Sequence, residues 1–147
     1  MFKHILVPTD GSDLSRDAVA KAVAFVREIA ARITFFYAWP EHKGYFFGEG
    51  SLDNHMTQDE FAEVMERQAR DVLAEAEAVA KAAGVACATE AESSDAPSAA
   101  IIATATRCQC DVVFMASHGR RGVSGLLLGS ETMKVLTHCK IPVLVYR

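Results

Sequence analysis

Apolar residues along this chain follow two alternating patterns, continuous runs of strand length and stripes with the spacing of a helix. Continuous apolar runs predict strands at residues 5–7, 32–39, 85–89, 111–116 and 141–146. Apolar residues repeated every three or four positions predict helices at residues 14–30, 57–83, 97–107 and 130–138. This alternation predicts one α/β domain over residues 1–147: a doubly wound, five-stranded parallel sheet of Rossmann-like type, with helices on both faces.

Local signals mark the ends of the predicted helices. Ser12 stands where a helix N-cap is expected, and Thr57 with Glu60 has the spacing of a capping box. Gly84 follows the second helix, where a left-handed residue commonly ends a helix. Asp95 is predicted to cap the third helix, with Pro97 in its first turn.

The stretch from residue 40 to residue 56 has no usable period, and we interpret it as a long loop. It contains Phe46 and Phe47, adjacent aromatic residues that suit a lid over a ligand or a patch for a partner. Packing of the loop onto its own domain is the alternative.

In a doubly wound sheet, ligands bind beyond the carboxyl ends of the strands, where the strand order reverses. The loops after Val7, Trp39 and Ala116 are therefore the candidates. The last of them, residues 117–129, is rich in glycine and leads into a helix. Glycines let backbone amides approach an anion, and the helix N-terminus adds free N–H groups. This is the composition of a phosphate-binding loop, although plain glycine-rich turns share it, and it is neither a Walker loop nor a Gly-x-Gly-x-x-Gly turn.

The spacing within this loop resembles that of the universal stress protein family. Nucleotide-binding members carry Gly, two residues, Gly, nine residues and Gly-Ser or Gly-Thr; this chain has the pattern at Gly119, Gly129 and Ser130, but Ala116 replaces the first glycine. Residues 5–12 are similar to the family's first strand and loop, and residues 141–145 to its last strand. The resemblance covers the whole chain.

The resemblance implies a sheet order of 3-2-1-4-5 and a site for ATP, or for AMP or ADP, with magnesium held through the nucleotide. It also implies a homodimer through the last strand, at Ile141, Val143 and Val145. The residues implied at the adenosine and ribose are Pro8, Thr9, Asp10, Ala38, Met115 and Ala116. Those implied at the phosphates are Gly119, Gly129 and Ser130.

Several polar residues near this predicted site have an alternative interpretation. Asp10 is a candidate ligand residue, but Asp before Gly also forms turns by binding nearby amides. Arg120 and Arg121 suit phosphate oxygens, or are simply solvated. His118 lacks a recognisable nucleophile and carboxylate for catalysis, and we interpret it as a loop residue positioned by the backbone. Glu131 would favour the helix dipole yet repel a triphosphate, which calls for magnesium.

Composition and charge limit the kinds of partner and ligand that we expect for this protein. A net charge of −4 and a pI near 5.7 give no support to a nucleic-acid interface. The start of the sequence has no export signal and no apolar run reaches the length of a membrane span, so we expect a cytoplasmic protein without a membrane partner. Cys108 and Cys110 could join His138 and Cys139 at a metal, but their spacing is not that of zinc sites, and we expect reduced thiols.

The leading functional hypothesis is an ATP-binding regulatory module of the stress response that works as a homodimer and needs no catalytic residue. A family member that has lost its nucleotide is the first alternative, and Ala116 is the residue that favours it. An enzyme of the related adenine-nucleotide hydrolase or ATP pyrophosphatase type is the second. Residues 9–13 depart from the Ser-Gly-Gly-x-Asp-Ser loop of such enzymes, and slow ATP hydrolysis or phosphorylation of a loop serine stays open.

Overall fold

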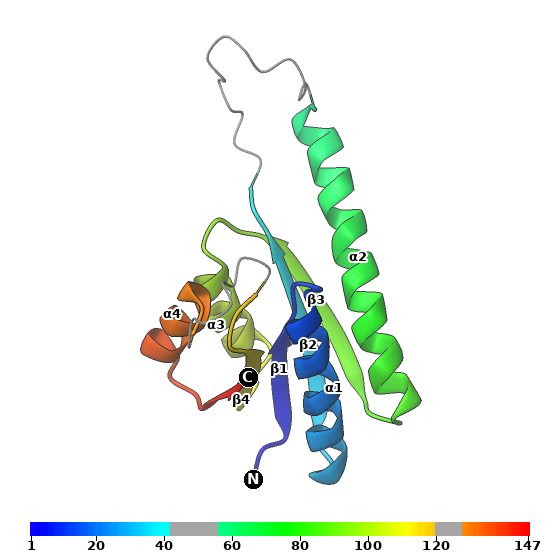
Figure 1. The fold of residues 1–147 in the computed structure, drawn as a ribbon, viewed down its shortest axis with the longest axis vertical. Coiled ribbons are helices and arrows are strands. Elements are labelled where there is room, and N and C mark those ends of the chain that lie inside the picture. Colours follow the sequence, from blue (N-terminus) through cyan, green and yellow to red (C-terminus); the bar gives the residue numbers. More distant parts are fainter. Residues whose placement is uncertain (42–55, 120–127) are drawn as a thin grey trace.

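The computed structural model describes residues 1–41, 56–119 and 128–147, and Figure 1 shows their arrangement. The elements are β1 (His4–Pro8), α1 (Asp13–Glu28), β2 (Arg32–Trp39), α2 (Gln58–Ala82), β3 (Cys87–Ser93), α3 (Pro97–Arg107), β4 (Val112–Ala116), α4 (Ser130–His138) and β5 (Val143–Tyr146). The predicted alternation of strands and helices is confirmed. Phe46, Phe47, Arg120 and Arg121 lie outside the described residues.

All five strands form one parallel sheet in the order β3-β2-β1-β4-β5. The strand order implied by the resemblance is therefore confirmed. After β1 the chain adds strands on one side, and after β3 it crosses to the other side to place β4 beside β1, with Ile5 opposite Val112 and Leu6 opposite Val113. The strand order reverses at this pair, so the carboxyl ends of β1 and β4 are neighbours.

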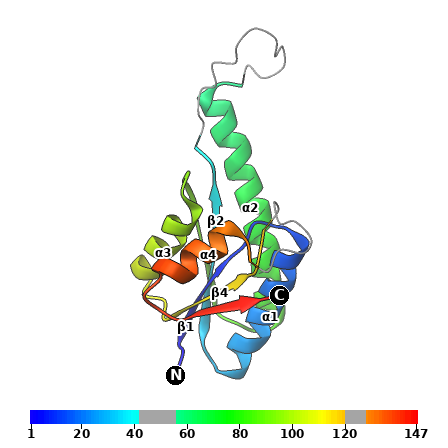
Figure 2. The same ribbon diagram turned by 60° about the vertical axis from the view of Figure 1, so that its left-hand side comes forward.

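Helices cover both faces of the sheet, α1 and α2 on one face and α3 and α4 on the other (Figures 1 and 2). Successive strand residues point to opposite faces. In β1, Ile5 and Val7 pack into the core beneath α1 and α2, while Leu6 packs into the core beneath α3 and α4. Both faces of the central strands are buried, which explains why their sequences are continuous apolar runs.

The predicted N-caps of the first two helices are confirmed. The Ser12 hydroxyl accepts a hydrogen bond from the Ser15 amide, and Thr57 and Glu60 form the reciprocal capping box. The predicted cap of α3 is wrong: the N-cap residue is Ala96, whose methyl side chain cannot accept a hydrogen bond. Asp95 precedes the cap, and its carboxylate instead accepts a hydrogen bond from the Glu41 amide at 3.1 Å.

The third strand is longer than its apolar residues predict, Cys87–Ser93 rather than 85–89. Its polar half pairs residue by residue with β2 as far as Ser93 opposite Trp39. As an edge strand it exposes polar side chains, and Arg107 of α3 forms ion pairs with Glu90 and Glu92. Pairing with the buried strand β2 therefore extends β3 beyond the residues whose own sequence favours a strand.

Three helices end in the same hydrogen-bonding motif. The residue after the C-cap has a left-handed backbone: Ala30 after α1 (φ 53°), Gly84 after α2 (φ 70°) and Gln109 after α3 (φ 56°). The next amide bonds back to a carbonyl in the last turn, from Ala31 to Val26, Val85 to Ala80 and Cys110 to Ala105. This is the Schellman motif, in which glycine is the favoured left-handed residue. Gly84 was identified from the sequence, whereas Ala30 and Gln109 are unfavourable residue types held by the same motif.

His4 is buried at the start of β1, with 7% of its surface exposed. Its Nε2 lies 2.7 Å from the Thr34 hydroxyl on β2. The Asp111 carboxylate accepts hydrogen bonds from the amides of Lys3 and His4 at 2.8 and 3.2 Å. Burial, and secondly the charge of Arg32, lower the pKa of His4 below its ordinary value of 6.5. The folded protein therefore favours the neutral imidazole.

The left-handed positions predict the sign of three substitutions. Ala30→Gly and Gln109→Gly should each raise the free energy of unfolding by about 1 kcal/mol, because glycine removes the clash of a side chain at positive φ. Gly84→Ala should lower it by about the same amount. Chemical denaturation measures the three values, and Ala83→Gly, at the ordinary C-cap angles of α2, is the control that should not stabilise. A loss of stability in Ala30→Gly would contradict this account of the helix ends.

The buried histidine predicts a loss of stability in mild acid. Below about pH 6.5 the unfolded chain binds a proton at His4 more readily than the folded chain does, so the free energy of unfolding falls as the pH falls. His4→Gln, which keeps a hydrogen-bonding group but cannot titrate, should show a smaller fall between pH 7.5 and 5.5. Urea denaturation of both proteins at each pH gives the comparison, and equal falls would show that His4 is not the group responsible.

Candidate functional site

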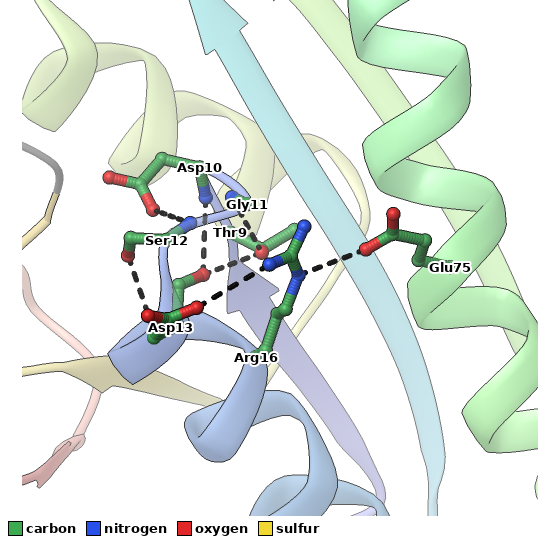
Figure 3. Close-up of polar contacts among 8 residues, drawn as sticks. Thr9, Asp10, Gly11, Ser12, Asp13, Arg16 and Glu75 are labelled. Atoms are coloured by element: carbon green, nitrogen blue, oxygen red, sulfur yellow. Dashed lines mark hydrogen bonds and ion pairs between the residues drawn. The ribbon is translucent and has the colours of Figure 1, made fainter.

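The loop after β1 is tied to the first turn of α1 by side-chain hydrogen bonds (Figure 3). The hydroxyls of Thr9 and Ser15 lie 2.5 Å apart, and the Ser15 hydroxyl also accepts from the Asp10 amide at 3.1 Å. Gly11 has a left-handed backbone (φ 75°), which a side chain would strain. These contacts fix the direction in which the strand end faces.

Asp10 connects this loop to the loop after β4. Its Oδ1 accepts a hydrogen bond from the Ser12 amide at 2.9 Å, so the turn-forming role considered from the sequence is present. Its Oδ2 lies against Gly119, because a Cβ atom added to that glycine would collide with this oxygen. Asp10 thus has both a local contact and a long-range one. The lack of a side chain at Gly119 is what allows the two loops to approach.

Ala116 ends β4 in an ordinary strand conformation. It pairs with Tyr146 of β5, and within the described residues positive φ angles outside glycine occur at Ala30 and Gln109 alone. Its backbone angles are therefore open to alanine, and nothing in its own conformation requires glycine. The next residue, Ser117, is buried, and its amide donates to the Tyr146 carbonyl at 2.7 Å. The last strand thus helps to hold the start of the glycine-rich loop.

The other end of the glycine-rich loop returns to the same place. The Gly129 amide donates to the Ser117 carbonyl at 2.7 Å. A Cβ atom at Gly129 would lie 3.2 Å from His118 Cα, closer than an ordinary van der Waals contact. The Thr132 hydroxyl donates to the Ala116 carbonyl at 3.1 Å. The first turn of α4 is therefore fixed against the end of β4.

Gly129 is the N-cap of α4, and no side-chain hydrogen bond caps this helix. The first amides of a helix have no partner within the helix, and with the helix dipole they attract anions. The uncapped N-terminus of α4 stands beside the carboxyl ends of β1 and β4. Backbone donors and a positive dipole end at this position suit phosphate oxygens.

Glu131 lies in the first turn of α4, as predicted, and its carboxylate contacts α3. Oε2 accepts from the Ser98 amide at 2.8 Å, and Oε1 lies 2.8 Å from Lys134 Nζ. Partial burial raises the pKa of Glu131, but hydrogen bonds from Lys134 and Ser98 outweigh it and hold that pKa below its ordinary range. The carboxylate is charged and already engaged at neutral pH.

The residues predicted for the site belong to three adjacent strands and α4. Ala38 lies near the end of β2, half-buried against the core beneath α3 and α4. The others that the structure describes end or follow β1 (Pro8, Thr9, Asp10), end or follow β4 (Met115, Ala116, His118, Gly119) or begin α4 (Gly129, Ser130, Glu131). Sequence reasoning missed Ser15, which holds both Thr9 and Asp10. Its signal was a polar residue on the buried face of α1, together with Ala18 and Val19.

Neither a metal centre nor a membrane span appears in the described parts of the chain. No group of three His, Cys, Asp or Glu residues in residues 1–41, 56–119 and 128–147 is arranged to hold an ion. The four cysteines are free, and burial raises the pKa of Cys110 to about 12. Within the same ranges, no helix combines the length and apolar character needed to cross a bilayer.

Solved structures share this fold over almost the whole chain. UspA from Lactobacillus plantarum has a TM-score of 0.82 at 24% identity, covering 99% of this chain and 98% of that one. A universal stress protein in complex with cAMP has a TM-score of 0.72 at 24% identity, covering 99% and 97%. An Arabidopsis thaliana family protein with AMP bound has a TM-score of 0.67 at 14% identity, covering 97% and 90%.

Curated relatives and a family model give the same result at the level of sequence. A Thermus aquaticus universal stress protein is 31% identical over 150 residues, covering 100% of both chains. Universal stress protein MJ0531 from Methanocaldococcus jannaschii is 28% identical, covering 100% of this chain and 83% of that protein. The model of the universal stress protein family matches residues 1–147. With its sheet order and glycine spacing, this chain belongs to the universal stress protein family.

Proposed function

We propose that this protein binds an adenine nucleotide, ATP with magnesium first among the candidates, and acts as a regulatory module of the stress response. The observation that carries the proposal is the convergence of the β1 loop, the Ala116–Gly119 segment and the uncapped N-terminus of α4. Family proteins of the same fold are complexed with cAMP and AMP, which supports an adenine nucleotide as the ligand class.

Each part of the site has a proposed role. Pro8, Thr9, Asp10 and the backbone of Ala38 line the adenosine, and Met115 and Ala116 lie beneath the ribose. Amides at Gly119, Gly129 and Ser130 hold the phosphates, with His118 beside them, and Arg120 and Arg121 are candidates for phosphate oxygens by their charge alone. The fit rests on two features of this chain: Ala116 has strand angles open to alanine, and both phosphate-loop glycines occupy places that a Cβ atom would crowd. Magnesium would reach the site through the nucleotide, neutralising phosphate charge in an acidic protein.

A role in binding rather than in turnover is favoured by the Ser117–His118 pair. The Ser117 hydroxyl lies 3.2 Å from His118 Nδ1, the contact expected of an activated nucleophile. Ser117 is only 2% exposed, however, and its backbone bonds to Tyr146 of β5 and to Gly129 at the far end of the loop. Burial of this residue argues against a nucleophile that a substrate must contact, and we interpret the pair as a structural contact at the base of the loop. The cytoplasm is the proposed location, where ATP is abundant.

A homodimer through β5 is the second part of the proposal. β5 is an edge strand, and Leu144 on it is 38% exposed. Backbone groups of alternate residues point to opposite sides of a strand. The Pro142 carbonyl accepts a bond from Val113 of β4, and the Tyr146 carbonyl accepts one from Ser117 just after β4. The backbone groups of Val143 and Val145 therefore face the open edge. Pairing with the same strand of a second copy would satisfy them and cover Leu144.

The nucleotide site predicts the outcome of a calorimetric series with Mg-ATP. The parent should bind, and Ala116→Gly should bind within about threefold of the parent, since the strand angles already suit alanine. Gly129→Val should abolish binding because its side chain would meet His118 and displace the first turn of α4. Gly119→Ala should weaken binding by forcing the Asp10 carboxylate away.

The control for folding in this series is the thermal unfolding temperature of each variant. Denaturation of purified parent protein with identification of any released nucleotide provides an independent test. If the parent does not bind and Ala116→Gly does, the protein is a family member that has lost nucleotide binding.

The edge strand predicts a dimer that proline can break. Val143→Pro removes an amide that faces the open edge while sparing the bonds to β4, so sedimentation at micromolar concentration should show a dimer for the parent and a monomer for the variant. Val145→Ala keeps that amide pattern and is the control, expected to remain a dimer. A monomeric parent, or a dimer that persists in Val143→Pro, would exclude this interface.

A further inference from the structure

The N-terminus of α3 has no cap from its own segment. Its N-cap residue, Ala96, has no side-chain acceptor, and Pro97 at the first helical position has no amide hydrogen. Ser98 is thus the first residue whose amide needs a partner. Asp95, the nearest acidic residue before the helix, bonds to the Glu41 amide.

The missing cap comes from another helix. Glu131 of α4 accepts the Ser98 amide at 2.8 Å, across 33 residues of sequence, and the two helices lie side by side (Figure 2). Ser98 is buried, with 8% of its surface exposed. A carboxylate at the first turn of a helix satisfies a free amide and interacts favourably with the dipole. The lowered pKa of Glu131 is consistent with a charged cap, and Lys134 orients it from one turn away.

The same glutamate lies in the turn proposed to hold phosphate. Two contacts fix that turn to the end of β4, from Gly129 to Ser117 and from Thr132 to Ala116. The hydrogen bond that Ser98 donates to Glu131 adds an attachment to α3. The amides at the start of α4 are therefore held between a strand and a helix.

We propose that Glu131 is a positioning residue, which caps α3 from α4 and thereby fixes the phosphate-facing turn of α4. This inference rests on the proposed nucleotide function for its consequence, but the link between the helices exists without a ligand. Glu131 acts through Ser98 and does not itself touch the nucleotide. Its ion pair with Lys134 offsets part of the carboxylate charge and so reduces its repulsion toward a triphosphate.

Hydrogen exchange in the nucleotide-free protein tests the link itself. In Glu131→Ala the amides of Ser98, Gly129 and Met133, which donate to Glu131, Ser117 and Gly129 in the parent, should exchange about tenfold faster, because the attachment between α3 and α4 is lost. Glu131→Gln should stay within about threefold of the parent, since its amide oxygen can still accept from Ser98. Lys134→Met removes the ion pair but keeps that bond, and is the control expected to match the parent. Unchanged exchange in Glu131→Ala would overturn the proposal.

Calorimetry with ATP and with adenosine tests whether the position of this turn affects phosphate binding. Glu131→Ala should weaken the affinity for ATP by about tenfold and the affinity for adenosine by less than about twofold. The reason is that in the proposed site only the phosphates contact α4. Adding Ala96→Asp gives α3 a cap of its own and should restore stability without restoring ATP affinity. If ATP affinity returns with stability, Glu131 is merely structural. Where Glu131→Ala alone does not fold, the double variant takes its place.

The remaining outcomes separate this inference from the proposed function. Tighter ATP binding in both Glu131→Ala and Glu131→Gln would overturn the inference and show that the carboxylate repels phosphate. If the parent binds neither ATP nor adenosine, the proposed function fails. Faster exchange in Glu131→Ala would then still establish that Glu131 holds α4, and unchanged exchange would refute it.

Discussion

The parallel pairing of β1 with β4 is the constraint on which the rest of this structure depends. Ile5 and Leu6 face Val112 and Val113, and all four side chains are fully buried between two layers of helices. Because crossovers between parallel strands are right-handed, crossovers that run in opposite directions along the sheet place their helices on opposite faces, and the strand order reverses at this pair. The reversal brings together two loops that are more than 100 residues apart in the sequence. Every contact between Asp10 and Gly119 follows from it.

The site consists mainly of backbone, and side chains act chiefly to place it. Ser15 holds the loop after β1, Ser117 and Gly129 close the glycine-rich loop, and Thr132 attaches α4 to β4. In the described residues these bonds are present without a ligand, and what they position is mainly backbone amides and the dipole of α4. The Ser117 amide also bonds to the Tyr146 carbonyl of β5, so the start of the glycine-rich loop is joined to the proposed dimer edge.

Much of the site could be predicted from the sequence because its chemistry depends on small residues at fixed spacing. Gly119, Gly129 and Ser130 stand in a recognisable pattern, and the structure gives both glycines a steric reason. From the sequence, Asp10 was a candidate either for ligand binding or for turn formation. The structure shows its contact within the turn and its close approach to Gly119 of the second loop. Ser15 and the Glu131 bond to Ser98 could not be predicted, since a hydroxyl or carboxylate gives no local sign of a partner on another element.

The sequence by itself determined the elements, their alternation and the N-caps of α1 and α2, because periodicity, capping boxes and C-terminal glycines act over a few residues. Thr57 with Glu60 and Gly84 are examples. Only the tertiary structure decided that β3 extends to Ser93 and that α3 is capped by Glu131 rather than by Asp95. In each case a contact between distant segments outweighs a weak local preference, and such contacts exist only once the sheet has brought the segments together.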